Sequence, residues 1–206
     1  MSAVLLFKRF LQRPFQVAYV VPSSPQLCRK VCSRMDLSVP RTIVELGPGE
    51  GCHTREIARK MHPESRLLLF EIDDVFCEHL RKQNSHDPRI EVVHTDAVNL
   101  PAELAARGIG HCDYVVSGLP FTLIDLPKKK AIVEKVFESL APEQHAAFII
   151  YQVSTELKQY AKFFPRVVTE YCLQNLPPIF VMQFFKVALP HGSKNGKHAK
   201  NGKARF

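Results

Sequence analysis

Short apolar runs alternate along the chain with segments in which apolar residues recur every three or four positions. The runs have the length of β-strands, and the periodic segments have the spacing of one buried helix face. The runs predict strands at 42–46, 66–72, 90–94, 113–117, 146–151, 166–173 and 179–187. The periodic segments predict helices at 53–61, 74–83, 101–107 and 155–163, and a longer helix with Ile132, Val133, Val136, Phe137 and Leu140 on one face.

This order of elements predicts an α/β fold. Strands that alternate with helices form a parallel sheet covered on both faces, because each crossover is right-handed. The last two strands have no helix between them, and Asn175-Leu176-Pro177-Pro178 joins them as an antiparallel hairpin. We therefore expect one Rossmann-like domain over residues 37–189, with five parallel βα units closed by a hairpin.

A helical extension is expected before the sheet, in residues 1–36. Within residues 3–13, apolar positions lie beside basic ones, as in amphipathic helices that bind membrane surfaces. The positions concerned are Leu5, Phe7, Phe10 and Leu11 on the apolar side and Lys8, Arg9 and Arg13 on the basic side. At the other end of the chain, residues 190–206 have little to bury, and they are expected to form a disordered basic tail.

A second helix of this extension is expected to run to about Met35. It begins in one of two registers. Ser23 with Gln26 fits a capping box, and Ser24 with Pro25 at the first helical position fits the alternative.

A glycine-rich loop follows the first predicted strand, in the sequence Glu45-Leu46-Gly47-Pro48-Gly49-Glu50-Gly51. Its three glycines allow unusual backbone angles and a close approach to a ligand. Glu71 ends the next strand, 20 residues after Gly51, where it can bind ribose hydroxyls. Asp96 follows the third strand and can accept a hydrogen bond from an adenine amino group. The loop therefore predicts a site for a nucleoside cofactor.

Two cofactors are candidates for binding to this loop. The NAD fingerprint spaces its glycines as G-x-G-x-x-G to approach a pyrophosphate, whereas this loop has G-x-G-x-G. Glu45 and Glu50 would repel a pyrophosphate, but they suit the cationic amino group of a methionine. Spacing and charge both favour S-adenosylmethionine.

The segment Ser117-Gly118-Leu119-Pro120-Phe121 follows the fourth strand. Rossmann-like methyltransferases that act on amines commonly carry a polar-x-Pro-aromatic turn at this place. Together with Val21-Pro22-Ser23-Ser24 and Asn175-Leu176-Pro177-Pro178, the segment resembles the bacterial phospholipid N-methyltransferases, relatives of the ribosomal RNA adenine dimethyltransferases. The resemblance covers about residues 5–188 and implies the seven-stranded methyltransferase sheet.

The resemblance also implies a reaction and roles for particular residues. Members methylate phosphatidylethanolamine towards phosphatidylcholine, and relatives act on ornithine lipids. By position, the methionine end of the cofactor would contact Glu45, Gly47, Gly49 and Gly51, the ribose Glu71 and Ile72, and the adenine Asp96 and Ala97. The amine would meet the methyl group on a floor formed by Ser117, Gly118, Leu119, Pro120 and Phe121, with Ser117 also beside the cofactor.

Two tyrosines, Tyr19 and Tyr151, are candidates for taking the proton of the amine, directly or through water. Together with Phe121 they could also stabilise the methylated, cationic head group by cation–π contact. His53 and His94 are expected to be neutral structural residues. Tyr19 and Thr122 depart from the family pattern, which leaves the lipid head group open.

Charge is uneven along the chain. The net charge is +8, yet six Lys or Arg precede Asp36 and six follow Glu170 with no acid in either stretch, so the body between them is mildly acidic. Basic ends suggest an anionic partner. We expect an anionic membrane surface, contacted through residues 3–13 and the tail, and a peripheral location on the cytoplasmic face of the membrane.

The remaining features exclude other classes of site and location. No apolar run approaches the roughly 20 residues that span a bilayer. The amino terminus lacks the features of a signal peptide. The six cysteines are scattered without a Cys-x-x-Cys pair, so we expect reduced thiols and no metal site.

Two other functions fit parts of the sequence. An RNA adenine N6-methyltransferase would explain the charge and the Pro-aromatic turn. Against it, Ser117-Gly118 stands where Asn is expected, and no helical RNA-binding domain follows the sheet. A membrane-binding module that only keeps the fold is disfavoured by the intact cofactor acids. The lipid function is preferred, with no nucleic-acid partner.

Overall fold

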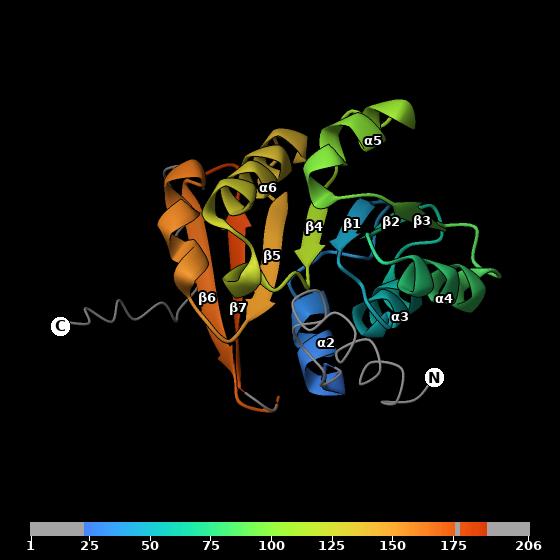
Figure 1. Ribbon diagram of the computed structural model, residues 1–206, viewed down its shortest axis with the longest axis horizontal. Helices are drawn as coiled ribbons and strands as arrows, with labels where there is room; N and C mark the ends of the chain where they lie inside the picture. The colour runs from blue at the N-terminus through green and yellow to red at the C-terminus, as the bar shows by residue number, and fades with distance from the viewer. Residues whose placement is uncertain (1–22, 176–177, 189–206) are drawn as a thin grey trace, which may run out of the picture.

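The computed structural model describes residues 23–175 and 178–188, and these form a seven-stranded sheet with helices on both faces (Figure 1). The strands are β1 (Thr42–Leu46), β2 (Arg66–Glu71), β3 (Ile90–His94), β4 (Tyr114–Ser117), β5 (Ala147–Gln152), β6 (Arg166–Cys172) and β7 (Ile179–Phe185). The α-helices are α2 (Pro25–Cys32), α3 (Cys52–Lys60), α4 (Asp74–Asn84), α5 (Leu100–Ala106) and α6 (Leu126–Ser139). Three 3₁₀ helices are η1 (Ala97–Asn99), η2 (Phe121–Leu123) and η3 (Glu156–Phe163).

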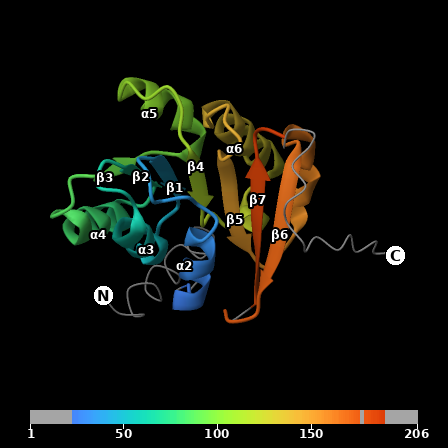
Figure 2. The same ribbon diagram turned by 180° about the vertical axis from the view of Figure 1, so that it is seen from behind.

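The strand order is β3-β2-β1-β4-β5-β7-β6, with β1 to β5 parallel to one another. The arrowheads of β4 and β5 point towards α2, and β7 runs in the opposite direction (Figures 1 and 2). The expected hairpin of β6 and β7 is confirmed. Its second strand also pairs antiparallel with β5, so β7 lies between β5 and β6. The Rossmann-like fold expected from the sequence is thereby confirmed.

Alternate residues of each strand divide the core into two clusters. Val44 and Leu46 of β1 pack on the side of α5 and α6, whereas Ile43 packs on the side of α2, α3 and α4. Period-two alternation sends successive side chains of a strand to opposite faces. Since both faces of the central strands are covered, β2 and β4 are buried along almost their whole length.

The first described helix settles the two registers left open by the sequence. Ser24 is the N-cap of α2, its Oγ accepts a hydrogen bond from the Leu27 backbone N–H at 3.1 Å, and Pro25 occupies the first turn. The alternative with Ser23 is therefore wrong. The segment expected to be helical at 155–163 forms the 3₁₀ helix η3.

Several expectations fall on residues that the structure leaves undescribed. They are the amphipathic helix of residues 3–13, Tyr19 and the tail from residue 190. In the described ranges, none of the helices has the length and apolar character needed to cross a bilayer.

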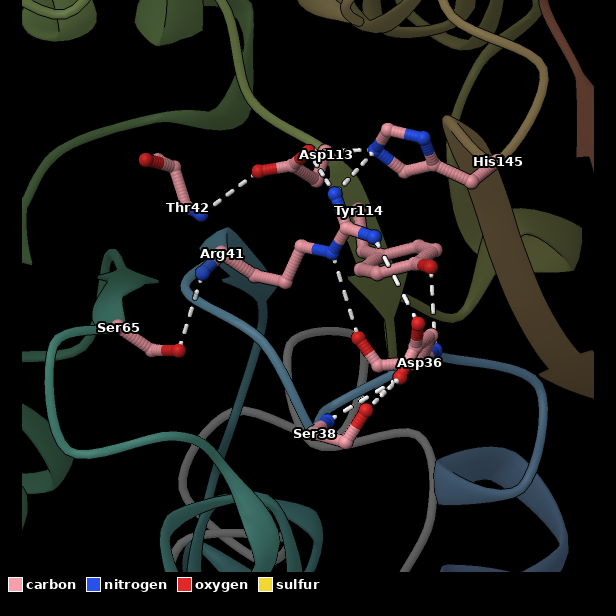
Figure 3. A network of polar contacts seen from close by, with 8 residues as sticks. All are labelled: Asp36, Ser38, Arg41, Thr42, Ser65, Asp113, Tyr114 and His145. Carbon is pink, nitrogen blue, oxygen red and sulfur yellow. Dashed lines mark hydrogen bonds and ion pairs between the residues drawn. The ribbon is translucent and has the colours of Figure 1, made fainter.

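The ends of the sheet where the parallel strands begin are joined by a polar network (Figure 3). Asp113, directly before β4, accepts hydrogen bonds from Arg41 Nη1 at 3.1 Å and the Thr42 backbone N–H at 2.8 Å. The Nε2 atom of His145, just before β5, lies 2.6 Å from Asp113 Oδ1. The backbone N–H of Arg41 donates to Ser65 Oγ, before β2, at 3.0 Å. These bonds fix the starts of four strands relative to one another.

Candidate active site

The cofactor loop runs from the carboxyl end of β1 into α3, and its three glycines have φ values of +66°, +55° and +74°. Two of them are enclosed. A Cβ on Gly47 would lie 2.8 Å from Leu119 Cδ2, and one on Gly51 would lie 2.7 Å from Gln83 Nε2 on α4. A Cβ on Gly49 would meet nothing within 4 Å. Of the three, only Gly49 therefore faces open space that a ligand can fill.

Glu71, at the carboxyl end of β2, is joined to this loop. Its Oε2 accepts a hydrogen bond from the Gly49 backbone N–H at 3.3 Å, and its Oε1 accepts from the N–H groups of Ile72 and Asp73 at 2.9 and 3.0 Å. Burial raises the pKa of this carboxyl, and the three backbone donors oppose that rise. The carboxylate is thus held at a fixed place between two strand ends.

Glu45, in β1, is completely buried beneath the loop. Its Oε2 accepts a hydrogen bond from Thr54 Oγ1 on α3 at 2.7 Å, while its Oε1 has no partner within the described residues. Burial raises the pKa of Glu45 to about 7. A buried carboxylate oxygen without a donor is costly, so the group is suited to receive a cation or a donor from a ligand.

The segment after β4 packs directly on the cofactor loop. The Gly118 N–H donates to the Leu46 carbonyl at 2.9 Å, and the Leu119 N–H donates to Ser117 Oγ at 3.3 Å. Residues 117–119 and Gly47 are thus adjacent.

The aromatic ring of Phe121 occupies a place different from the one expected. The side chain is 0% exposed and packs with Phe148 at a ring-centroid distance of 6.4 Å. We therefore assign it to anchoring the segment after β4 in the core, because a ring enclosed on all sides has no free face for a cationic head group.

Tyr151, near the end of β5, does reach the segment after β4. Its hydroxyl lies 2.5 Å from the position that a Cβ on Gly118 would take, and the Gly47 carbonyl lies 2.8 Å from the same position. Its ring stacks on His53 of α3, with centroids 4.1 Å apart. His53 is buried, and burial lowers its pKa to about 3, so it is neutral as expected.

The residues expected near the adenine are tied to neighbouring elements. Asp96 caps η1 through a hydrogen bond from the Val98 N–H at 3.1 Å and forms an ion pair with Lys128 of α6 at 2.5 Å. Ala97 is buried, and Ile72 is half exposed. The ion pair with Lys128 was missed by the sequence analysis, since 32 residues separate the partners and neither position has a local signal.

These residues fit S-adenosylmethionine. Glu71 would hold the ribose, Asp96 the adenine, and the open space at Gly49 with the unpartnered oxygen of Glu45 would hold the methionine end. An ammonium group near Glu45 would favour the ionised carboxylate. Thr54, which sequence analysis missed, orients Glu45 from the first turn of α3.

Comparison with known proteins agrees with S-adenosylmethionine as the cofactor. A family model described as ribosomal RNA adenine dimethylase matches residues 21–162. The ornithine lipid N-methyltransferase of Singulisphaera acidiphila is 32% identical over 174 residues, 84% of this chain and 91% of that protein. The rRNA adenine N-6-methyltransferase of Aeromicrobium erythreum is 34% identical over 77 residues, 37% of this chain and 22% of that protein.

Solved structures share the fold. A precorrin-6y C5,15-methyltransferase of Geobacter metallireducens has a TM-score of 0.60 at 12% identity and covers 78% of this chain and 88% of its own. A methyltransferase of Geobacter sulfurreducens has a TM-score of 0.58 at 17% identity and covers 88% of both chains. The family match, the relative that is matched over 91% of its length and the shared fold support one conclusion. The chain belongs to the ribosomal RNA adenine dimethylase family and is an S-adenosylmethionine-dependent N-methyltransferase.

Proposed function

We propose that this enzyme methylates the amine of a membrane lipid head group, and that the lipid is an ornithine lipid. Phosphatidylethanolamine, which the sequence analysis preferred, is the second lipid candidate. The observation that carries the proposal is the length of the match to the ornithine lipid N-methyltransferase, which extends over 91% of that protein. The rRNA methyltransferase of Aeromicrobium erythreum is matched over only 22% of its length.

Methyl transfer depends mainly on how the cofactor and the amine are placed relative to each other. The cofactor supplies a methyl group on a sulfonium, the amine nitrogen forms the new bond to carbon as the bond from sulfur to carbon breaks, and the amine loses a proton. Holding the two reactants in line supplies most of the catalysis. In this chain, the contact between the segment after β4 and the Gly47 loop would set that placement.

Tyr151 has a defined part in this proposal. Burial raises its pKa well above the usual value, so its phenol stays protonated and is a poor general base. Its hydroxyl oxygen can still accept a hydrogen bond from the incoming amine and orient the nitrogen lone pair. The proton would leave through water, and the ring would stabilise the cationic product.

Membrane contact is part of the same proposal. Residues 3–13 and the tail carry the bases that would approach an anionic surface, each contributing on the order of 1 kcal/mol. The protein would act as a peripheral enzyme on the cytoplasmic face of the membrane.

RNA adenine methylation is the second candidate function, because the family model that matches residues 21–162 is that of the ribosomal RNA adenine dimethylases. The absence of a side chain at Gly118 is the feature of the site that weighs against it, since Asn is expected at this turn in those enzymes. Tyr151 and the Gly47 carbonyl leave no room for such a side chain.

The deciding experiment incubates the enzyme with methyl-labelled S-adenosylmethionine and four separate substrates. These are vesicles containing ornithine lipid, vesicles containing phosphatidylethanolamine, vesicles of phosphatidylcholine alone, and total ribosomal RNA. We expect label in ornithine lipid and a mass increase of one methyl group or more. Label in RNA with none in either amino lipid would overturn the proposal. Gly49→Val serves as the inactive control, and Gly108→Val as its matched active control.

A further inference from the structure

We infer that the segment 122–130, which follows the floor of the active site, is a docking loop that inserts two leucines into an anionic bilayer. The inference rests on the proposed lipid substrate, because a lipid whose acyl chains stay in the membrane must reach the site at a point where the protein touches that membrane. The loop is distinct from residues 3–13 and joins the site directly through Phe121.

The first observation is where exposed apolar side chains lie. Of the seven large hydrophobic side chains that are exposed in the described part of the chain, six lie at or beyond the carboxyl ends of β2, β4, β5 and β6. They are Ile72, Leu123, Leu126, Val153, Tyr171 and Leu173, and the seventh, Val39, lies before β1. Single exposed apolar residues are common over a protein surface, but here they gather at one edge of the sheet. This edge is also the one that holds Gly49 and Glu71.

The second observation is how the docking loop is built. Phe121 and Ile124 turn inward and pack on the core, while Leu123 and Leu126 turn outward with 49% and 62% exposure. Two inward anchors hold the loop in shape. The outward leucines therefore have fixed, exposed positions on the segment that follows the floor of the active site.

The third observation is charge. Asp125 caps α6, and Lys128, Lys129 and Lys130 follow with no acid in the first turn of the helix. The positive end of the helix dipole disfavours lysines here, by about 0.3–1 kcal/mol each. Helix stability therefore does not account for their placement. The segments 122–130 and 153–163 together hold five lysines against two acids.

The three lysines have different partners. Lys128 pairs with Asp96, and the buried Lys129 pairs with Glu156 of η3, so these two join the docking loop to its neighbours. Lys130 is 58% exposed and lies 3.6 Å from Glu134, also exposed, which is a weak pairing in water. Lys130 is thus the base best placed to meet a lipid phosphate while Leu123 and Leu126 enter the acyl region.

The absence of tryptophan from the chain allows a direct test. Leu126→Trp introduces one fluorophore into the docking loop, and Val39→Trp introduces one at the opposite end of the sheet. With vesicles of phosphatidylethanolamine and phosphatidylglycerol, we expect the Leu126→Trp emission to shift to the blue and to be quenched by brominated acyl chains. The Val39→Trp emission should stay unchanged. Full vesicle binding with an unshifted, unquenched Leu126→Trp would overturn the inference and leave docking to residues 3–13.

A second measurement uses polar substitutions. Leu123→Ser with Leu126→Ser should weaken vesicle binding in flotation by about tenfold, while Val39→Ser leaves it unchanged. Cofactor affinity in calorimetry should match that of the wild type in both. Unchanged flotation of the double variant would contradict docking, and loss of a dimer in sedimentation without any vesicle binding would assign the leucines to a second copy of the chain.

These tests separate the inference from the proposed function. Emission and flotation require no methyl transfer, so they report on docking alone. Label in RNA with none in lipid would remove the proposed substrate even if the loop bound vesicles.

Discussion

Polar groups next to the central strands are paired differently at the two ends of the sheet. Where the parallel strands begin, Asp113, Arg41 and His145 form bonds that satisfy one another (Figure 3). Where they end, Glu45 keeps a buried oxygen without a partner, both ring nitrogens of His53 likewise find no partner in the described ranges, and the cofactor loop has positive φ angles.

This difference shows which end is specialised for stability and which for binding. Satisfied polar networks rigidify a fold, whereas unpartnered buried groups cost stability unless a ligand completes them. Perturbation of the first end should therefore lower the free energy of unfolding, and perturbation of the second should lower ligand affinity. Substitutions at each end of the sheet test this division.

Gly49→Val should produce the largest effect. A valine at φ +55° is strained, and its side chain would fill the open space that the cofactor needs. We expect calorimetry to detect no binding of S-adenosylmethionine, a loss of more than about 4 kcal/mol for a micromolar ligand.

Gly108→Val is the matched control for that variant. Gly108 also has a positive φ, +67°, and open space around its Cα, but it follows α5 at the other end of the sheet. The Gly108→Val variant should lose a similar amount of stability and bind the cofactor with wild-type affinity. Equal cofactor affinity of Gly49→Val and the wild type would show that this loop does not bind the cofactor.

Asp113→Ala should have the second-largest effect. It removes the acceptor for Arg41, the Thr42 backbone and His145, and leaves the partly buried guanidinium with the more distant Asp36 carboxylate, at 3.8 Å, as its ionic partner. We expect the free energy of unfolding in urea to fall by about 3 kcal/mol, with cofactor affinity unchanged in the folded protein. A large loss of affinity at full stability would contradict the division between the two ends.

Glu71→Ala should weaken cofactor binding by about 1.5–3 kcal/mol for each charged hydrogen bond to ribose that is lost. Glu71→Gln keeps the shape and should lose less. Thermal unfolding without cofactor controls for the three backbone hydrogen bonds that the carboxylate accepts. Wild-type affinity in a stably folded Glu71→Ala protein would move the ribose site elsewhere.

The smallest effect concerns pH. Burial lowers the pKa of His53 from 6.5 to about 3, so between these values the unfolded chain binds a proton that the folded chain does not. Stability contributed by neutral His53 is therefore lost as pH falls through this window. His53→Phe removes that loss.

Relative to wild type, His53→Phe should gain up to about 1.4 kcal/mol of stability per pH unit as pH falls from 6.5. The raised pKa of Glu45, about 7, has the opposite effect, since stability falls as pH rises from 4.5 towards 7, and it is common to both proteins. Urea unfolding at pH 7 and pH 5 measures the difference. Parallel pH curves for the two proteins would contradict a buried, neutral His53.

Sequence reasoning succeeded where the signal is local. A few adjacent residues determine each of three features: the glycine loop, the strand ends that carry Glu71 and Ser117, and the cap of α2 at Ser24 or its neighbour. Period-two and helical patterns carry the same kind of local information, which explains the agreement on the five parallel strands.

It made no prediction, or a wrong one, where residues far apart in sequence decide the outcome. The position of β7 between β5 and β6 depends on pairing across the sheet rather than on the hairpin turn. The burial of Phe121 depends on Phe148, and the Arg41–Asp113 network joins residues 72 positions apart. The local pattern of apolar and polar residues contains no signal for any of these contacts.

The contact between Tyr151 and Gly118 constrains substitution at two positions. The tyrosine hydroxyl and the Gly47 carbonyl lie 2.5 and 2.8 Å from the place that a Cβ at 118 would take. A side chain there therefore requires both a shorter residue at 151 and a shift of the cofactor loop, so a single substitution at 118 should not be tolerated.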